Sequence, residues 1–317
     1  MVAINNYNVY MLVVILLSAF GVITLLFWIS VFIFGKIFFE TSCRRRKGDE
    51  HFAETEPRKA KNAPDRKWLF SHNIEEITIT SFDGLKLKGF FVKNNSNKLA
   101  ITVHGYHGRY YSLSKQAQFL YENDYNLLMI NNRCHDTSEG KVISMGKNEA
   151  KDLYQWMDLM IKRNPEYQIL LFGVSMGAHI VMMTLNNLPQ NVKCAVEDCG
   201  YSSLYSQMIY TSGKNHVKSP KFAAWCGNVY ALVFHHFSFR NDTKNTLKDC
   251  KVPLLLMHGD KDNMVPFKNL EINASLVNPN IYKETHVFTD CDHCEQIKIK
   301  GEEYAQVVNN FVNKFIK

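Results

Sequence analysis

A serine flanked by glycines lies where an apolar run of the chain gives way to a helical pattern. Ser175 is the centre of Gly173-Val174-Ser175-Met176-Gly177, and a strand-like run, 169–174, leads directly into it. This spacing is typical of a sharp strand-to-helix turn that presents a serine hydroxyl at the end of a sheet strand. A side chain at either glycine would collide with neighbouring backbone. We therefore predict that Ser175 is a nucleophile and that Gly173 and Gly177 shape its turn.

Two polar residues further along the chain could activate this serine. Asp262 follows the strand-like run 252–257, and His293 follows the last such run, 283–288. An imidazole can accept the serine proton and return it to a leaving group, while a carboxylate holds the imidazole in the required tautomer. The order serine, aspartate, histidine is the one expected for this turn motif.

Other residues could fill the same roles. Asp260, in the same loop as Asp262, and Asp198, after the preceding strand, are alternative carboxylates. His293 could instead bind a metal together with Cys291 and Cys294. Zinc sites usually have four protein ligands, however, and the sequence has no second well-spaced pair. We therefore predict no metal and no organic cofactor.

A glycine-containing loop follows the strand-like run 99–103. It reads His104-Gly105-Tyr106-His107-Gly108. The backbone amides of Tyr106 and Met176 could donate hydrogen bonds to a developing oxyanion, and Gly105 would keep the approach open. We interpret His104 and His107 as structural, because His293 already supplies a base.

Apolar strand patterns alternate with helical patterns from residue 74 to the end of the chain. A predicted hairpin comes first, turning at Asp83-Gly84. Alternating strands and helices indicate an α/β fold, with a mostly parallel sheet covered by helices on both faces and antiparallel pairing at one edge. The segment 201–245 interrupts the alternation and is rich in aromatic residues. We predict that it is a helical cap insertion within a catalytic domain of residues 74–317.

The N-terminal segment is apolar, and a basic cluster follows it. No charged residue precedes Lys36, and the uncharged run Met11 to Phe34 is long enough to cross a bilayer as one helix. A cleavable signal peptide would have a positive start and a shorter core. We therefore predict an anchor over 1–40 and a polar, basic tether over 41–73. The positive flank favours a single-pass protein with a cytoplasmic catalytic domain, the extracytoplasmic orientation being the alternative.

The charge and cysteine content agree with this interpretation. The net charge of +7 is concentrated after the apolar run, and no basic, aromatic-interleaved face follows it, so we predict no nucleic-acid partner. The eight cysteines are scattered, which favours reduced thiols over a disulfide framework.

Taken together, these motifs resemble the α/β-hydrolase superfamily, and most closely its bacterial esterase and serine-aminopeptidase-like branch. Five blocks carry the resemblance, and they are His104 to Tyr106, Asn132 to Gly140, Gly173 to Gly177, His258 to Pro266 and the region of His293. The resemblance implies Ser175, Asp262 and His293 as a catalytic triad, with Tyr106 and Met176 at the oxyanion hole. It also implies hydrolysis of an ester, thioester or amide without a metal or organic cofactor.

The second block departs from the usual family pattern Asp-x-Arg-Gly-x-Gly-x-Ser. Asn131 replaces the aspartate, while Cys134 and Asp136 replace the two glycines. The residue before the histidine, often glycine, is Asp292. We expect these changes to affect efficiency and specificity rather than the reaction class.

The anchor and the aromatic cap favour a serine esterase that acts on a small-molecule or lipid-like acyl substrate. A peptidase, an acyl transferase and a non-catalytic binding protein on the same fold are the alternatives.

Overall fold

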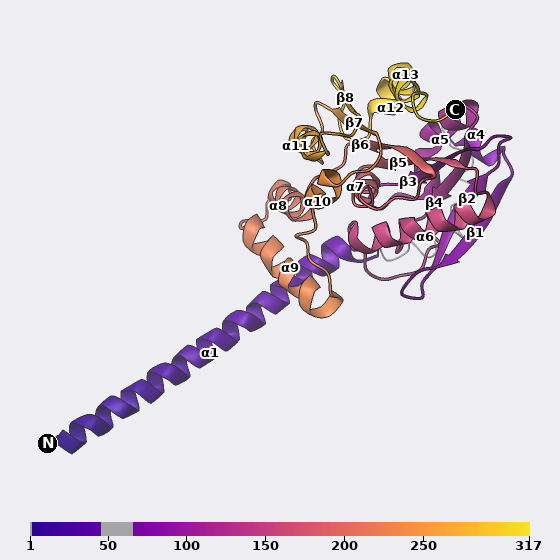
Figure 1. Cartoon of the computed structure of the whole chain (residues 1–317). Helices are drawn as coiled ribbons and strands as arrows, with labels where there is room; N and C mark the ends of the chain where they lie inside the picture. Colours follow the sequence, from indigo (N-terminus) through magenta and orange to yellow (C-terminus); the bar gives the residue numbers. More distant parts are fainter. Residues whose placement is uncertain (1, 46–65) are drawn as a thin grey trace. The chain divides into compact units, whose positions relative to one another are not determined.

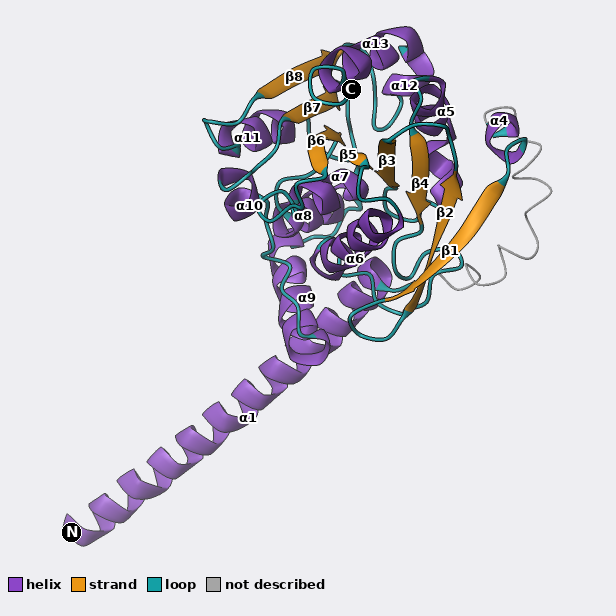
Figure 2. Ribbon diagram, turned by 45° about the vertical axis from the view of Figure 1, so that its right-hand side comes forward, coloured by secondary structure: helices purple, strands orange, loops and turns teal. Residues whose placement is uncertain are grey.

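The computed structural model of the chain describes residues 2–45 and 66–317 (Figure 1). Within these residues, eight strands form one sheet in the order β1-β2-β4-β3-β5-β6-β7-β8 (Figure 2). Strand β2 pairs antiparallel with β1 and with β4, and every other neighbouring pair is parallel. The predicted α/β fold with an antiparallel N-terminal hairpin is confirmed.

The strands are β1 (Ile74–Thr80), β2 (Lys86–Val92), β3 (Lys98–Val103), β4 (Asn126–Ile130), β5 (Gln168–Val174), β6 (Val192–Asp198), β7 (Leu254–Gly259) and β8 (Lys283–Phe288). The helices are α1 (Val2–Cys43), α4 (Lys67–Phe70), the 3-10 helix η1 (Tyr110–Leu113), α5 (Ser114–Glu122), α6 (Lys147–Arg163), α7 (Met176–Met182), α8 (Leu204–Lys214), α9 (Pro220–His235), α10 (Lys244–Lys248), α11 (Lys268–Leu276), α12 (Gln296–Ile299) and α13 (Gly301–Val312).

Helices cover both faces of the sheet, and the central strands are apolar for that reason. Helices α5 and α13 lie on one face and α6 and α7 on the other (Figure 2). On the first face the rings of Phe119 and Tyr304 pack at a centroid distance of 6.2 Å, and Phe119 also meets Phe172 of β5. On the second face the Trp156 ring lies so close to β2 that a Cβ added to Gly89 would be 2.9 Å from it. Double-sided burial explains why every residue of β4 is buried.

The chain divides into two compact units, and the first joins segments that are far apart in the sequence. It consists of Met1–Ser42 and Met208–Phe239, so α1 and α9 belong together. A side chain at Gly35 of α1 would overlap the carbonyl oxygen of Cys226. The Phe39 ring stacks on His235 with centroids 4.3 Å apart and also packs against Tyr230. Part of the predicted cap is therefore packed on the predicted anchor.

The second unit, Cys43–Gln207 with Arg240–Lys317, contains the whole sheet. Part of the predicted tether also belongs to it, because Leu69 of α4 is fully buried within the main hydrophobic core. The Arg45 guanidinium donates a 2.7 Å hydrogen bond to the carbonyl oxygen of Ser138. Residues 46–65 of the predicted tether lie outside the described residues.

Helix α1 contains the predicted membrane span. At 42 residues it is about 63 Å long at 1.5 Å per residue, twice the thickness of a hydrocarbon core. Its stretch Tyr7–Cys43 is long and apolar enough to cross a membrane, and a signal sequence would pass the same test.

Candidate active site

Ser175 occupies a strained turn between β5 and α7. Its φ is +58°, a left-handed conformation that non-glycine residues seldom adopt outside functional turns, and its amide donates a 2.8 Å hydrogen bond to the carbonyl of Asp198. A Cβ at Gly173 would overlap the Gly177 carbonyl oxygen, and a Cβ at Gly177 would overlap the Val103 carbonyl oxygen. Both glycines are thus needed where the sequence predicted them, because β5, α7 and β3 approach one another closely.

The structure brings Ser175, His293 and Asp262 together in one hydrogen-bonded chain. His293 Nε2 lies 2.9 Å from Ser175 Oγ, and His293 Nδ1 lies 2.7 Å from Asp262 Oδ2. These residues follow β5, β8 and β7, whose carboxyl ends meet at one edge of the sheet. The geometry is that of a nucleophile, a base within hydrogen-bonding distance and a carboxylate that orients the base.

Asp262 is held as a buried anion by four groups. Its Oδ1 accepts hydrogen bonds from the amides of Met264 and Val265 at 2.9 and 2.8 Å. Its Oδ2 faces His293 and also His258 Nε2, which is 3.1 Å away. Burial alone would raise the pKa of the carboxyl, but the hydrogen bonds from His258 and His293 outweigh it and hold the pKa well below its usual range.

His258 is a second histidine that faces the Asp262 carboxylate, and the sequence interpretation did not single it out. It is fully buried at the end of β7, four residues before Asp262. Its Nε2 lies 3.0 Å from the carbonyl oxygen of Val265, so the same nitrogen faces both the carboxylate and the backbone of the Asp262 loop. The sequence feature that could have identified it is the position of this histidine near the end of β7, just before the loop that contains Asp262.

The alternative carboxylates have other partners. Asp260 accepts a 2.7 Å hydrogen bond from the amide of Asp290, which fixes a turn. Asp198 accepts hydrogen bonds from the Tyr304 hydroxyl at 2.7 Å and from Gln296 at 3.2 Å, and burial raises its pKa to about 7. Asp262 is the carboxylate whose side chain bonds to His293.

Two neighbouring groups, Asp262 and Cys294, act on the imidazole of His293. Burial lowers its pKa, but the hydrogen bonds and charges of Asp262 and Cys294 outweigh burial and raise the pKa above its ordinary value. A base must be neutral to accept a proton. The Cys294 side chain therefore influences the pH at which His293 can act.

The loop after β3 passes directly beside the nucleophile. A Cβ at Gly105 would lie 3.1 Å from Ser175 Cβ, so the loop's approach leaves little room for a side chain. Met176 is the first residue of α7, and the amides of a first helical turn have no acceptor within the helix. His104 is fully buried, and its Nδ1 lies 2.8 Å from the Gly105 carbonyl oxygen. Burial lowers the pKa of His104 to about 3, so this histidine is neutral.

A cavity of about 320 Å³ opens over Ser175 and His293. Its apolar lining comes from Leu113, Val174, Met264 and Ile297, together with the ring of Tyr106. Two lysines, Lys115 and Lys298, also line it, and none of its described lining residues is acidic. The cavity can therefore accept an apolar group next to the serine and has no carboxylate to bind a cationic one.

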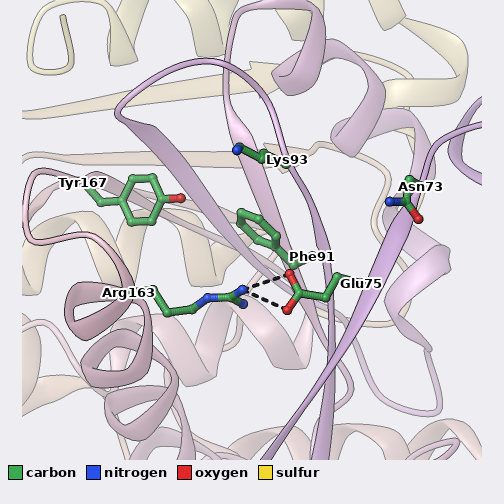
Figure 3. A pocket seen from close by; sticks show the side chains of 6 residues that line it. All are labelled: Asn73, Glu75, Phe91, Lys93, Arg163 and Tyr167. Carbon is green, nitrogen blue, oxygen red and sulfur yellow. Dashed lines mark hydrogen bonds and ion pairs between the residues drawn. The ribbon is translucent and has the colours of Figure 1, made fainter.

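A second cavity, of about 290 Å³, lies beside the β1–β2 hairpin (Figure 3). Its centre is an ion pair in which the Arg163 guanidinium donates to both carboxylate oxygens of Glu75, at 2.8 and 2.9 Å. Asn73, Lys93 and Tyr167 complete its polar lining. This pairing satisfies the charges of Arg163 and Glu75 within the protein, and the cavity's described lining contains no serine, cysteine or histidine.

The residues that depart from the family pattern, Asn131, Cys134 and Asp136, belong to one turn of the backbone. Cys134 and Asp136 have φ values of +65° and +47°, the left-handed region in which glycine is usual. Asn131, which stands where an aspartate is usual, donates a 2.9 Å hydrogen bond to Asp136 and accepts one of 2.7 Å from the amide of Tyr110. The turn is thus retained by a side-chain network.

A profile of the prolyl oligopeptidase family matches residues 111–317. The YfhR protein of Salmonella typhi is 25% identical over 286 residues, which cover 82% of this chain and 89% of that protein, and YfhR of Escherichia coli K12 is 23% identical over 255 residues, or 76% and 81%.

The solved structures that are similar to this one include an esterase and an acylaminoacyl peptidase. The Pyrococcus furiosus esterase Pf2001 has a TM-score of 0.64 and 26% identity, with 80% of this chain and 94% of that chain covered. The Pyrococcus horikoshii acylaminoacyl peptidase has a TM-score of 0.61 at 16% identity, with 80% and 44% covered, and this likeness concerns the fold.

Proposed function

The chain belongs to the prolyl oligopeptidase family and is a serine hydrolase of the α/β-hydrolase fold, and on that premise we propose that it cleaves carboxylic esters through Ser175, His293 and Asp262. The observation that carries the proposal is the continuous hydrogen-bonded chain from Ser175 Oγ through the imidazole of His293 to the buried Asp262 carboxylate. Similarity to the esterase Pf2001 supports the same reaction class.

The reaction proceeds in two halves. His293 Nε2 takes the proton from Ser175 Oγ as the oxygen attacks the ester carbonyl, and Asp262 stabilises the imidazolium that forms. The imidazolium returns its proton to the alkoxide leaving group, which yields an acyl-enzyme. Water, deprotonated by His293, then attacks the acyl carbonyl, and the imidazolium gives that proton to Ser175 Oγ as the acid leaves. The amides of Tyr106 and Met176 stabilise the oxyanion in both halves.

The cavity lining favours an ester with an apolar acyl group. Leu113, Met264 and Ile297 offer apolar surface to such a group. An aminopeptidase needs a carboxylate to bind the free amine of its substrate, and the described lining has none. A thioester would also fit, because the same residues act on its carbonyl.

The nucleophile is tested by labelling the detergent-solubilised full chain with a fluorescent fluorophosphonate, which reacts with serines activated by a neighbouring base. We expect the parent protein to be labelled and Ser175→Ala to be unlabelled. The matched control is Ser206→Ala, whose serine is exposed on α8 and should label like the parent. A well-folded parent that takes no label would contradict the proposed hydrolase and support a binding protein on the same fold.

Substrate class is tested with p-nitrophenyl esters of rising acyl length beside aminoacyl and N-acylated peptide p-nitroanilides. We expect kcat/KM to be highest for an ester of intermediate or long acyl chain. Faster turnover of any amide would replace the esterase proposal with a peptidase.

We further propose that α1 anchors the enzyme in the cell membrane with its catalytic unit in the cytoplasm. Packing of α1 against α9 supports retention of the helix, because removal as a signal sequence would expose Cys226 and Tyr230. The basic residues after the span favour the cytoplasmic side. An alkaline phosphatase fused to the C-terminus should be inactive in a bacterial host. An active fusion would show the opposite orientation.

A further inference from the structure

Two cysteines from separate loops meet beside the proposed catalytic histidine. Cys199 follows β6, and Cys294 follows β8 and is the chain neighbour of His293. Their sulfur atoms are 3.5 Å apart. The possible ligand atoms of Cys199, Cys294 and His293 all lie within 4.8 Å of one another. Cys291, the partner considered from the sequence, faces the Thr289 carbonyl instead.

The spacing of the two sulfurs suits a shared cation. In a tetrahedral site with zinc–sulfur bonds of about 2.3 Å, two thiolate ligands are about 3.8 Å apart. A disulfide requires about 2.05 Å, so the sulfurs would have to approach by about 1.5 Å. The observed 3.5 Å is much closer to the first arrangement.

The proposed ligands are accessible from the cavity. Cys294 and His293 line the cavity over Ser175, while Cys199 is fully buried behind them. A cation that enters the cavity therefore meets two of the three ligands directly.

We propose that Cys199, Cys294 and His293 form an inhibitory binding site for a soft divalent cation, of which zinc is the example. Both sulfurs bind as thiolates after their protons pass to water, and one imidazole nitrogen donates the third lone pair. Water or a group of the substrate takes the fourth position. Both nitrogens of His293 are engaged in the triad, to Ser175 and to Asp262, so either choice of ligand atom breaks one link. The cation thereby removes the general base.

Cation binding can be tested without any enzyme activity. Only the inhibitory effect of the cation rests on the proposed function. The full-length Ser175→Ala protein, kept reduced with a phosphine, is titrated with cobalt(II), whose bonds to thiolates give a charge-transfer absorption band. We expect this band, and we expect its loss when Cys199→Ser or Cys294→Ser is added. Cys250→Ser is the matched control, because Cys250 is equally buried but bonds to the Val252 carbonyl. Absence of the band in the reduced Ser175→Ala protein would overturn the site.

Inhibition is then measured with zinc on the active protein. We expect zinc to suppress ester hydrolysis, a chelator to restore it, and the inhibition constant to rise at least about tenfold in Cys199→Ser, since loss even of supporting groups typically weakens metal affinity 10–100-fold. Each variant is compared with its own zinc-free rate. Equal zinc sensitivity of the parent and Cys199→Ser would overturn the proposal even if the enzyme proves to be an esterase. An inactive parent that still shows the cobalt band would sink the esterase and leave the metal site standing.

Discussion

Replacement of Asp262 by asparagine tests the proposed triad most directly. The shape of the side chain is kept, but one carboxylate oxygen becomes an amide NH2. The amides of Met264 and Val265 still need an acceptor, so the asparagine oxygen faces them. The NH2 group then faces His293 Nδ1, which must become the acceptor. The histidine proton moves to Nε2 and points at Ser175, and the base is lost.

The size of the effect follows from this tautomer change. In a triad whose geometry is otherwise intact, the wrong tautomer lowers kcat by about 10⁴-fold. At 1.36 kcal/mol per factor of ten, the barrier rises by about 5 kcal/mol. Folding should survive, because the buried anion is replaced by a neutral group that retains the two backbone hydrogen bonds.

The assay is the initial rate of hydrolysis of a p-nitrophenyl ester by parent and variant at neutral pH, with circular dichroism to confirm the fold. The matched control is Asp260→Asn, since Asp260 accepts a backbone hydrogen bond that asparagine can also accept. We expect the control to stay within about threefold of the parent. A folded Asp262→Asn protein that keeps more than a tenth of the parent rate would refute the reasoning, as would a larger loss in Asp198→Asn.

Four further predictions follow from the geometry. Cys294→Ala should shift the acid limb of the pH–rate profile to lower pH, because the Cys294 side chain raises the pKa of His293 and only the neutral imidazole is active. An unshifted acid limb would show that Cys294 has no such influence. Gly177→Ala should give no soluble folded protein on expression, because its Cβ would overlap the Val103 carbonyl. Leu69→Ala should lower the free energy of unfolding, measured by urea, by about 2–5 kcal/mol, whereas a tether residue would give no change. Arg133→Met should cost about 3–5 kcal/mol in the same assay, because it leaves Asp152 buried without its ion pair, and a near-neutral result would count against that pair.

The sequence was sufficient to predict the fold and to predict that Ser175, Asp262 and His293 lie close together, for a physical reason. Parallel strands bring their carboxyl ends to one edge of a sheet, so polar residues that follow successive strands must gather there. Ser175, Asp262 and His293 each follow such a strand. The requirement for Gly173 is equally local, because its Cβ would overlap the Gly177 carbonyl within the same turn, whereas the requirement for Gly177 arises from the close approach of Val103 in β3.

Long-range packing was not readable from the sequence. The role of His258 depends on the path of the Asp262 loop, and the meeting of Cys199 with Cys294 depends on two loops separated by 95 residues. The burial of Leu69 was hidden because α4 is only four residues long and lies in a polar stretch. No periodicity of α1 alone could indicate that Gly35 is the point at which α9 approaches it.

The contact between α1 and α9 has a consequence for how the protein is made. The ribosome releases α1 first, and the strands β1 to β6 are synthesised before α9 follows. During that interval Gly35 and Phe39 lack the partners they have in the finished unit. Early insertion of α1 into lipid, or a chaperone, would shield this face until Cys226 and Tyr230 arrive. Closure of the α1–α9 pair is thus a late step of biogenesis, and a chain shortened at its N-terminus would complete synthesis with the matching face of α9 uncovered.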